Sequence, residues 1–209
     1  MRLAALLLSC LMLAGCGAGK DNPDREAARA AKRLDRQASK AKFARAGSWG
    51  SYSGQIDTRW EDDGLTMVLL NELRYTDPYG EVWIAPAGSR VNGASIPRAF
   101  WTMIGGPFEG KYRNASVLHD VAYEHHTRPW QDVDRMFYNA MRCSGVGAFT
   151  AKTMYYTLVR HGRHWKYPKA QTVAPDPHQA PPDDEIQQWI KTNDPSLEQI
   201  EERAKSEGR

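Results

Sequence analysis

The chain has 209 residues, of which 41% are hydrophobic and 25% are charged, and its formal net charge is +3 at pH 7. This length suits one domain of ordinary size with flanking segments, and the small net charge argues against a nucleic-acid-binding protein. No apolar run approaches the roughly 20 residues that a transmembrane helix needs, which excludes a polytopic membrane protein. Three cysteines are too few for a disulfide-stabilised scaffold.

The N-terminus predicts a signal for export and lipidation. Arg2 precedes an apolar stretch, residues 3–13, which is too short to span a bilayer but typical of a signal peptide. The following Leu-Ala-Gly-Cys sequence resembles the bacterial lipobox, in which the cysteine is acylated with chains such as palmitate and the chain is cut just before it. We therefore expect residues 1–15 to be a signal peptide and Cys16 to carry the lipid, with an ordinary secretory signal as the alternative.

A lipid anchor predicts a place in the bacterial cell envelope. Gly17, and not an aspartate, follows the acylated cysteine, which favours the outer membrane, facing the periplasm. Residues 16–46 are rich in Ala, Arg and Lys but poor in large apolar side chains, which predicts a basic tether between lipid and domain. Cys143 is then the single thiol of the folded part, and we expect it to be a small buried side chain without a disulfide partner.

Residues 47–167 have the pattern of one globular domain. Residues 65–75 and 81–86 predict strands, and the Asp-Pro-Tyr-Gly turn between them predicts a β-hairpin, with a further strand within residues 49–60. Helical segments follow the strands. This order predicts an α+β fold, in which a small antiparallel sheet precedes a three-helix region.

The helical part is punctuated by proline and glycine. Pro97 suits the first turn of a helix that runs to Ile104, where a glycine-rich stretch ends it. Three further helices are predicted at residues 112–126, 131–144 and 148–162. Residues 168–209 form a Pro-rich, acidic tail, in which we expect two short peripheral helices at about residues 183–190 and 195–204.

The first two of these three helices predict a polar pair. The short loop between them makes an antiparallel helical hairpin, and His119 and Asp134 lie equally far from the middle of that loop. If both side chains point into the seam they can hydrogen-bond, which is the arrangement that orients an imidazole as a general base. Asp120 points about 100° away around the helix and is free to face a hard cation, whereas Tyr123 can hydrogen-bond Asp120 or Asp134.

Several motifs in this region occur in a fixed order and resemble a known family. The stretch from Tyr75 to Trp165 resembles domain-of-unknown-function family 1353 of bacterial and phage proteins. The matching segments are Asp77-Pro78-Tyr79-Gly80, Asn92-Gly93-Ala94-Ser95-Ile96-Pro97, Leu118-His119-Asp120, Arg135-Met136-Phe137-Tyr138 with Ala140-Met141, and Lys152-Thr153-Met154-Tyr155-Tyr156. The name of that family implies no particular activity.

A second, local resemblance does imply chemistry. His119-Asp120-x-x-Tyr123, followed by Asp134 on the next helix, is similar to the helical pair of calcium-dependent phospholipase A2. The resemblance implies that His119 activates water, Asp120 binds calcium and Asp134 orients the histidine. It further implies that calcium and a loop amide near Gly105–Gly110 stabilise the oxyanion.

These observations predict an envelope-anchored hydrolase of lipid esters with catalytic residues His119, Asp134 and Tyr123. The alternative is a non-catalytic lipoprotein that binds an envelope or phage-derived partner. A third hypothesis is a metal-dependent cell-wall hydrolase, whose ligands would include His125 and His126. A serine hydrolase that uses Ser95 or Ser116 stays open, although neither serine lies in a G-x-S-x-G elbow. The water-activating mechanism requires that solvent reaches the His119–Asp134 pair.

Overall fold

The computed structural model describes residues 49–93, 95, 106, 108–167 and 183–207. The expected signal peptide, Cys16, the basic tether, the helix predicted from Pro97 to Ile104 and the Pro-rich residues 168–182 lie outside the described residues. Within the described part of the chain, no helix combines the length and the apolar character that crossing a bilayer requires.

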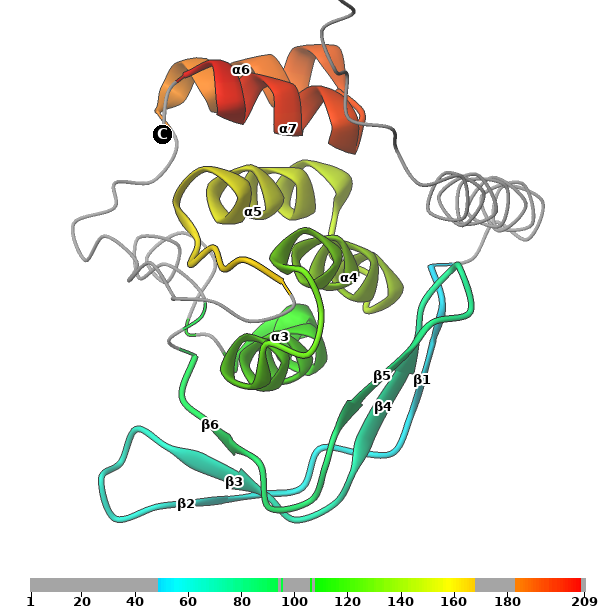
Figure 1. The fold of residues 1–209 in the computed structure, drawn as a ribbon, viewed down its shortest axis with the longest axis vertical. Coiled ribbons are helices and arrows are strands. Elements are labelled where there is room, and N and C mark those ends of the chain that lie inside the picture. Colours follow the sequence, from blue (N-terminus) through cyan, green and yellow to red (C-terminus); the bar gives the residue numbers. More distant parts are fainter. Residues whose placement is uncertain (1–48, 94, 96–105, 107, 168–182, 208–209) are drawn as a thin grey trace, which may run out of the picture. The chain divides into compact units, whose positions relative to one another are not determined.

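Two three-stranded antiparallel sheets support the helices (Figure 1). Their strands are short, and each sheet takes strands from separated parts of the chain. The first sheet has the order β1 (Ser51–Ser53), β4 (Leu73–Thr76), β5 (Val82–Ala85), and the second has the order β2 (Thr58–Trp60), β3 (Met67–Leu69), β6 (Arg90–Val91). Because helices follow these strands, the predicted α+β class is confirmed.

The predicted hairpin is present between β4 and β5. Tyr75 pairs with Trp83 and Leu73 with Ala85, and these four side chains are buried on one face. The Asp77 carboxylate closes the turn, because its Oδ1 accepts the backbone N–H groups of Tyr79 at 2.8 Å and Glu81 at 2.9 Å. An aspartate that bonds the backbone two residues further on is the usual way in which this residue type stabilises a turn.

The prediction of one continuous strand over residues 65–75 is wrong. The chain forms β3 and β4, which belong to different sheets, and the two strands are separated by residues 70–72. In an unbroken strand Asn71 would share the inward face of Leu69 and Leu73. The chain bends instead, so Asn71 is exposed and its amide donates to the Asp57 carboxylate at 2.7 Å. The cost of burying an amide therefore divides the strand.

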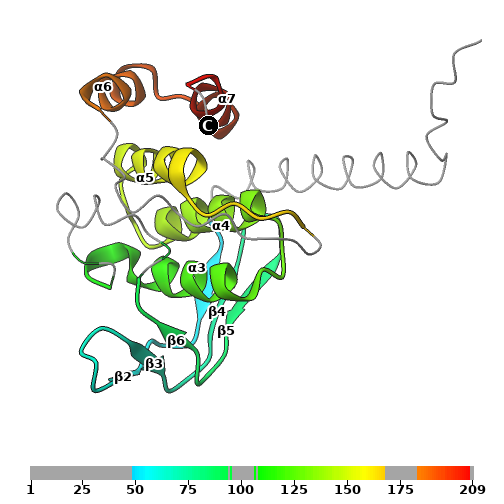
Figure 2. The same cartoon turned by 60° about the vertical axis from the view of Figure 1, so that its left-hand side comes forward.

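The three central helices are confirmed. They are α3 (Arg113–His125), α4 (Trp130–Cys143) and α5 (Ala148–His161). Helix α3 lies over β5 and β6, α4 contacts α3, and α5 contacts α4 (Figures 1 and 2). His126 has a left-handed backbone conformation with φ of 50°, which ends α3 and turns the chain back toward α4.

Two short helices follow the Pro-rich stretch, as predicted. They are α6 (Asp184–Asn193) and α7 (Leu197–Ser206), and both contact α5. They are less peripheral than expected, because Ile200 of α7 is fully buried and Glu201 accepts hydrogen bonds from Tyr155 Oη at 2.6 Å and Arg135 Nε at 2.9 Å. This part of the acidic tail therefore contributes to the core of the domain.

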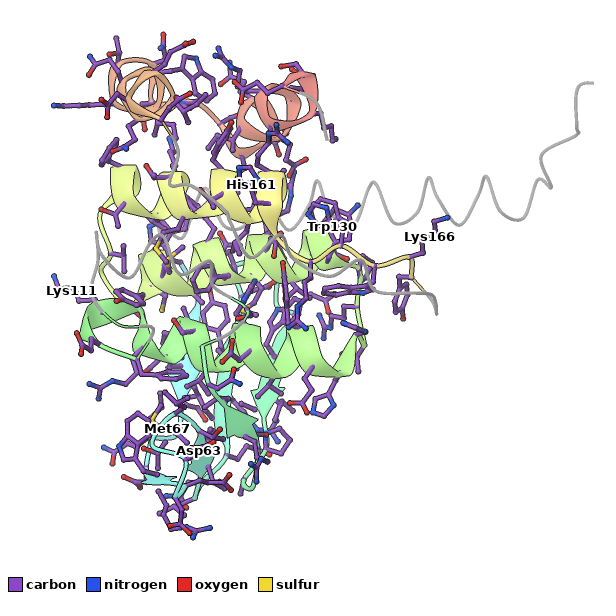
Figure 3. All side chains as sticks on the ribbon, turned by 90° about the vertical axis from the view of Figure 1, so that its left-hand side faces the viewer. Asp63, Met67, Lys111, Trp130, His161 and Lys166 are labelled. Carbon is purple, nitrogen blue, oxygen red and sulfur yellow. The ribbon has the colours of Figure 1, made fainter. Side chains whose placement is uncertain are left out.

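Figure 3 shows how the elements stack from the strands to the last helices. Asp63 and Met67, at the β2–β3 end, lie far from His161 at the end of α5 (Figure 3). The order of the layers places the α3–α4 seam between the second sheet and α5. The candidate site lies in this seam, at the edge where β6 ends.

Candidate functional site

The α3–α4 seam brings the predicted pair together. His119 Nε2 and Asp134 Oδ1 are 3.0 Å apart, which is a hydrogen bond, and both side chains are 0% exposed. Tyr123, one turn further along α3, donates its hydroxyl to the same Asp134 oxygen at 2.6 Å. The predicted register of the helical hairpin, and the predicted contact of Tyr123, are therefore present.

The second nitrogen of the imidazole has a partner that the register did not predict. His119 Nδ1 lies 2.9 Å from Ser95 Oγ, on the segment that follows β6. Both ring nitrogens are thus occupied by protein atoms, and the ring packs between Tyr123 and Phe137 at centroid distances of 4.1 and 4.7 Å. The expectation that solvent reaches His119 directly is wrong, because the segment carrying Ser95 covers the ring.

Asp120 points away from His119 around the helix, as predicted, but it faces backbone and not solvent. Its Oδ2 accepts the N–H groups of Asn92 at 3.2 Å and Gly93 at 2.6 Å. Its Oδ1 accepts the N–H of Ser95 at 3.2 Å and also the Ser95 hydroxyl, in a very short contact. Burial raises the pKa of Asp120 above its ordinary value, although these hydrogen bonds and the charge of His119 oppose the shift.

The predicted calcium ligand does not fit this geometry. A carboxylate offers about four acceptor positions, and four donors already occupy those of Asp120. Among the described residues, no group of three or more His, Cys, Asp or Glu side chains is placed to hold a metal ion. Calcium binding at Asp120 would require the segment from Asn92 to Ser95 to leave the carboxylate.

A cleft of about 340 Å³ opens beside Ser95 and Asp120, which are 6% and 7% exposed. The residues that line it come from the position just before β3, from β6 and the segment after it, from α3 and from the segment after α5. They are Thr66, Arg90, Val91, Asn92, Ser95, Asp120, Glu124 and Arg163. Ser95 and Asp120 are therefore the members of the network that line the cleft together with Asn92, whereas His119 does not line it.

The Ser95 hydroxyl lies between His119 Nδ1 and Asp120 Oδ1, and each of these atoms can either accept or donate a proton. Two arrangements of the same protons are therefore possible. In the first, neutral His119 accepts the Ser95 proton and a protonated Asp120 donates to Ser95 Oγ. In the second, the imidazolium donates to Ser95 Oγ, and Ser95 donates to an ionised Asp120. The two arrangements have equal charge, and His119 Nε2 donates to Asp134 in both. The first arrangement is the one that prepares Ser95 to lose its proton to His119.

Asp134 has one unsatisfied oxygen. Its Oδ1 accepts from His119 and Tyr123, whereas its buried Oδ2 has no hydrogen-bond partner among the described residues. The hydrogen bonds from His119 and Tyr123 therefore both reach the same oxygen of this carboxylate.

The other candidates from the sequence do not join this network. Ser116 donates to the Tyr112 carbonyl at 3.2 Å, and His126 stacks on Trp165 with centroids 4.4 Å apart. The Cys143 thiol is half-buried, donates to the Gly50 carbonyl at 3.3 Å, and has its pKa raised by burial. His125 is exposed at the end of α3. Ser116, the second nucleophile candidate, is thus a helix-bonded core serine.

The comparisons with known proteins agree with one of the two resemblances. Residues 67–158 match the family model described as "Protein of unknown function (DUF1353)". That stretch contains every member of the network described above, whereas the lipobox and the basic tether lie outside it. The phospholipase resemblance stays a prediction.

Two curated relatives come from Sinorhizobium fredii (strain NBRC 101917 / NGR234). "Uncharacterized protein y4jT" is 46% identical over 97 residues, which are 46% of this chain and 29% of the relative. "Uncharacterized protein y4iH" is 32% identical over 105 residues, which are 50% of this chain and 44% of the relative. The chain thus spans less than half the length of either relative. No solved structure gives a significant match.

The raised pKa of Asp120 predicts how stability depends on pH. Because its pKa is higher in the folded than in the unfolded protein, its stabilising contribution is full below about pH 3.8 and is lost as pH rises through the raised value. At pH 4, we expect the free energy of unfolding of the wild-type protein to be about 1–3 kcal/mol higher than that of Asp120→Asn. This difference in stability should become smaller toward pH 7, and urea unfolding at both pH values measures it.

The exposed Asp62, whose replacement by Asn should change stability by less than about 0.5 kcal/mol at either pH, is the control. A margin between wild type and Asp120→Asn that widens with pH would show that the hydrogen bonds, and not burial, dominate the pKa of Asp120.

Proposed function

We propose that this protein is an envelope-anchored hydrolase that cleaves acyl esters, with Ser95 as the attacking group and His119 as its base. One observation carries the proposal: the imidazole of His119 links a cleft-lining hydroxyl, 2.9 Å from Nδ1, to a buried carboxylate, 3.0 Å from Nε2. This is the connectivity of a nucleophile, base and orienting acid.

The proposed first step follows from those contacts. Ser95 Oγ forms a bond to the ester carbonyl carbon while its proton moves to His119 Nδ1, and the carbonyl electron pair moves onto oxygen. The electron pair on oxygen then re-forms the C=O bond, the C–O bond to the alcohol breaks, and the imidazolium gives its proton to the departing alcohol oxygen. Water next attacks the acyl carbon while His119 takes the water proton, the bond between Ser95 Oγ and carbon breaks, and the proton returns to Ser95 as the carboxylic acid leaves. The ionised Asp134 stabilises the imidazolium through Nε2.

Tyr123 supports this step as a positioning residue. Burial first, and then the neighbouring Asp134, raise the pKa of the Tyr123 hydroxyl well above its ordinary value. The hydroxyl therefore stays protonated and donates to Asp134 at 2.6 Å. That hydrogen bond fixes the carboxylate oxygen that faces the imidazole.

The predicted anchor favours a lipid ester as the substrate. Acylation of Cys16 would hold the domain at a membrane, and the basic tether would suit anionic headgroups. Calcium enters no step here, because the Asp120 carboxylate has no acceptor position left for it.

A non-catalytic binding lipoprotein is the second candidate, and a specific observation favours it. Asp120 holds three backbone N–H groups of the segment after β6, and His119 is fully buried, so the same network serves to fasten that segment to α3. If the network only holds this segment against α3, Ser95 is unreactive. The two functions therefore differ in whether the Ser95 hydroxyl attacks a substrate.

Replacement of Ser95 tests this directly. Ser95→Ala should lower ester hydrolysis by the purified mature protein by at least about 1,000-fold, because the nucleophile is gone. Ser116→Ala removes an equally small hydroxyl from the same region of the core and should leave the rate within about twofold. The measurement is release of p-nitrophenol from short-chain and long-chain esters, with circular dichroism to confirm folding.

The same assay separates the alternatives. His119→Ala should be as inactive as Ser95→Ala, and calcium or a chelator should not change the wild-type rate. Equal rates of ester hydrolysis in wild type, Ser95→Ala and His119→Ala would exclude the proposed hydrolase, and the non-catalytic binding lipoprotein would remain. A rate that requires calcium would contradict this mechanism, in which calcium enters no step.

Lipidation is tested separately from activity. Cys16→Ser should abolish incorporation of labelled palmitate and move the protein from the membrane to the soluble fraction, since the thiol is the predicted acyl acceptor. Cys143→Ser is the matched control and should keep both label and location. Labelling that survives in Cys16→Ser would contradict the predicted anchor.

A further inference from the structure

The proposed acyl transfer needs a hydrogen-bond donor for the carbonyl oxygen, which becomes negative as Ser95 attacks. Backbone N–H groups beside the nucleophile commonly supply it. In this protein the N–H groups of Asn92, Gly93 and Ser95 all donate to Asp120, so these described groups are not available. The donor must come from a side chain of the cleft or from a residue outside the described part.

Most polar side chains of the cleft are already engaged. Thr66 donates its hydroxyl to Asp63 at 2.6 Å, and Arg90 forms an ion pair with Glu61. Arg163 differs from them, because no described residue forms a hydrogen bond or an ion pair with its guanidinium, and its Nε is buried without a partner. Among the described residues, Arg163 is therefore the cation of this cleft whose guanidinium contacts an aromatic ring, that of Tyr123, and no hydrogen-bond acceptor.

The chain places Arg163 against the reactive network. Its Cζ lies 5.7 Å from the centroid of the Tyr123 ring, and that ring contacts His119. The preceding Gly162 permits this approach, because a Cβ there would lie 2.5 Å from the Leu158 carbonyl oxygen and 3.0 Å from the Tyr123 hydroxyl. Only glycine fits this position.

Trp165 fixes the segment on the other side of Arg163. Its side chain is buried, its Nε1 donates to the Arg128 carbonyl at 2.9 Å, and its ring meets Tyr123 edge-on at 5.0 Å. Arg163 thus projects from backbone held at both ends, which is the preorganisation that stabilisation of a transition-state charge requires.

We propose that Arg163 is the oxyanion donor of this site, an inference that rests on the proposed function of Ser95. As the bond between Ser95 Oγ and the carbonyl carbon forms, the electron pair of the C=O bond moves to oxygen, and a guanidinium N–H donates to that oxygen. The carboxylate of Glu124 in the same cleft would repel the oxyanion, so a cation that lines this cleft is needed.

The test compares two replacements of Arg163 in the purified mature protein. Arg163→Met keeps the length of the side chain and removes its charge and donors, so kcat for p-nitrophenyl esters should fall about 100-fold while KM stays within about twofold. Arg163→Lys restores a charged donor and should recover part of the loss. Arg160→Met removes a neighbouring arginine outside the cleft and should match wild type.

The outcomes distinguish this inference from the function on which it rests. A wild-type protein that hydrolyses no ester would overturn both. Wild-type hydrolysis with an unchanged kcat in Arg163→Met, or with a rise in KM alone, would overturn only the role of Arg163. If Arg163→Met does not fold, Arg163→Gln takes its place, since Gln is polar but uncharged. Wild-type kcat in Arg163→Gln, together with wild-type affinity for a phenylboronic acid, which forms an anionic tetrahedral adduct with a serine, would likewise overturn the role of Arg163.

Discussion

A histidine whose two ring nitrogens are both hydrogen-bonded inside the core is the constraint on which the rest of this structure depends. An imidazole without partners would be costly to bury, so three separate elements have to meet at His119. Helix α4 supplies Asp134, α3 supplies the ring itself, and the segment after β6 supplies Ser95. The hydrogen bonds therefore fix the position of the second sheet against the helical hairpin.

The same constraint determines which groups reach the cleft. Because Ser95 lies against the imidazole, the network reaches the wall of the cleft at Ser95, whose hydroxyl lies between His119 and Asp120. Asp120 in turn holds the backbone that carries Ser95, so the segment can move only if a buried carboxylate loses its donors. An enzyme and a binding protein would both use this rigidity, and they differ in whether the hydroxyl is a nucleophile.

Much of this fold could be predicted from the sequence, and the parts that could not were those set by distant contacts. The helical periodicity and the short loop between the two helices were sufficient to predict that His119 lies level with Asp134. The contact of Ser95 with His119 was not predictable, since it depends on the path of the chain after β6, which no local pattern determines. The break at Asn71 was hidden by the apolar residues on either side of it, and there the chain keeps the amide in solvent, hydrogen-bonded to Asp57.

The most direct test of the central contact is NMR spectroscopy of the ring nitrogens of His119 in protein with ¹⁵N-labelled histidine, assigned by comparison with His119→Gln. We expect a protonated Nε2 whose proton exchanges slowly with water and whose signal is lost or strongly shifted in Asp134→Asn. An Nε2 without a proton, or a ring signal that Asp134→Asn leaves unchanged, would contradict this expectation.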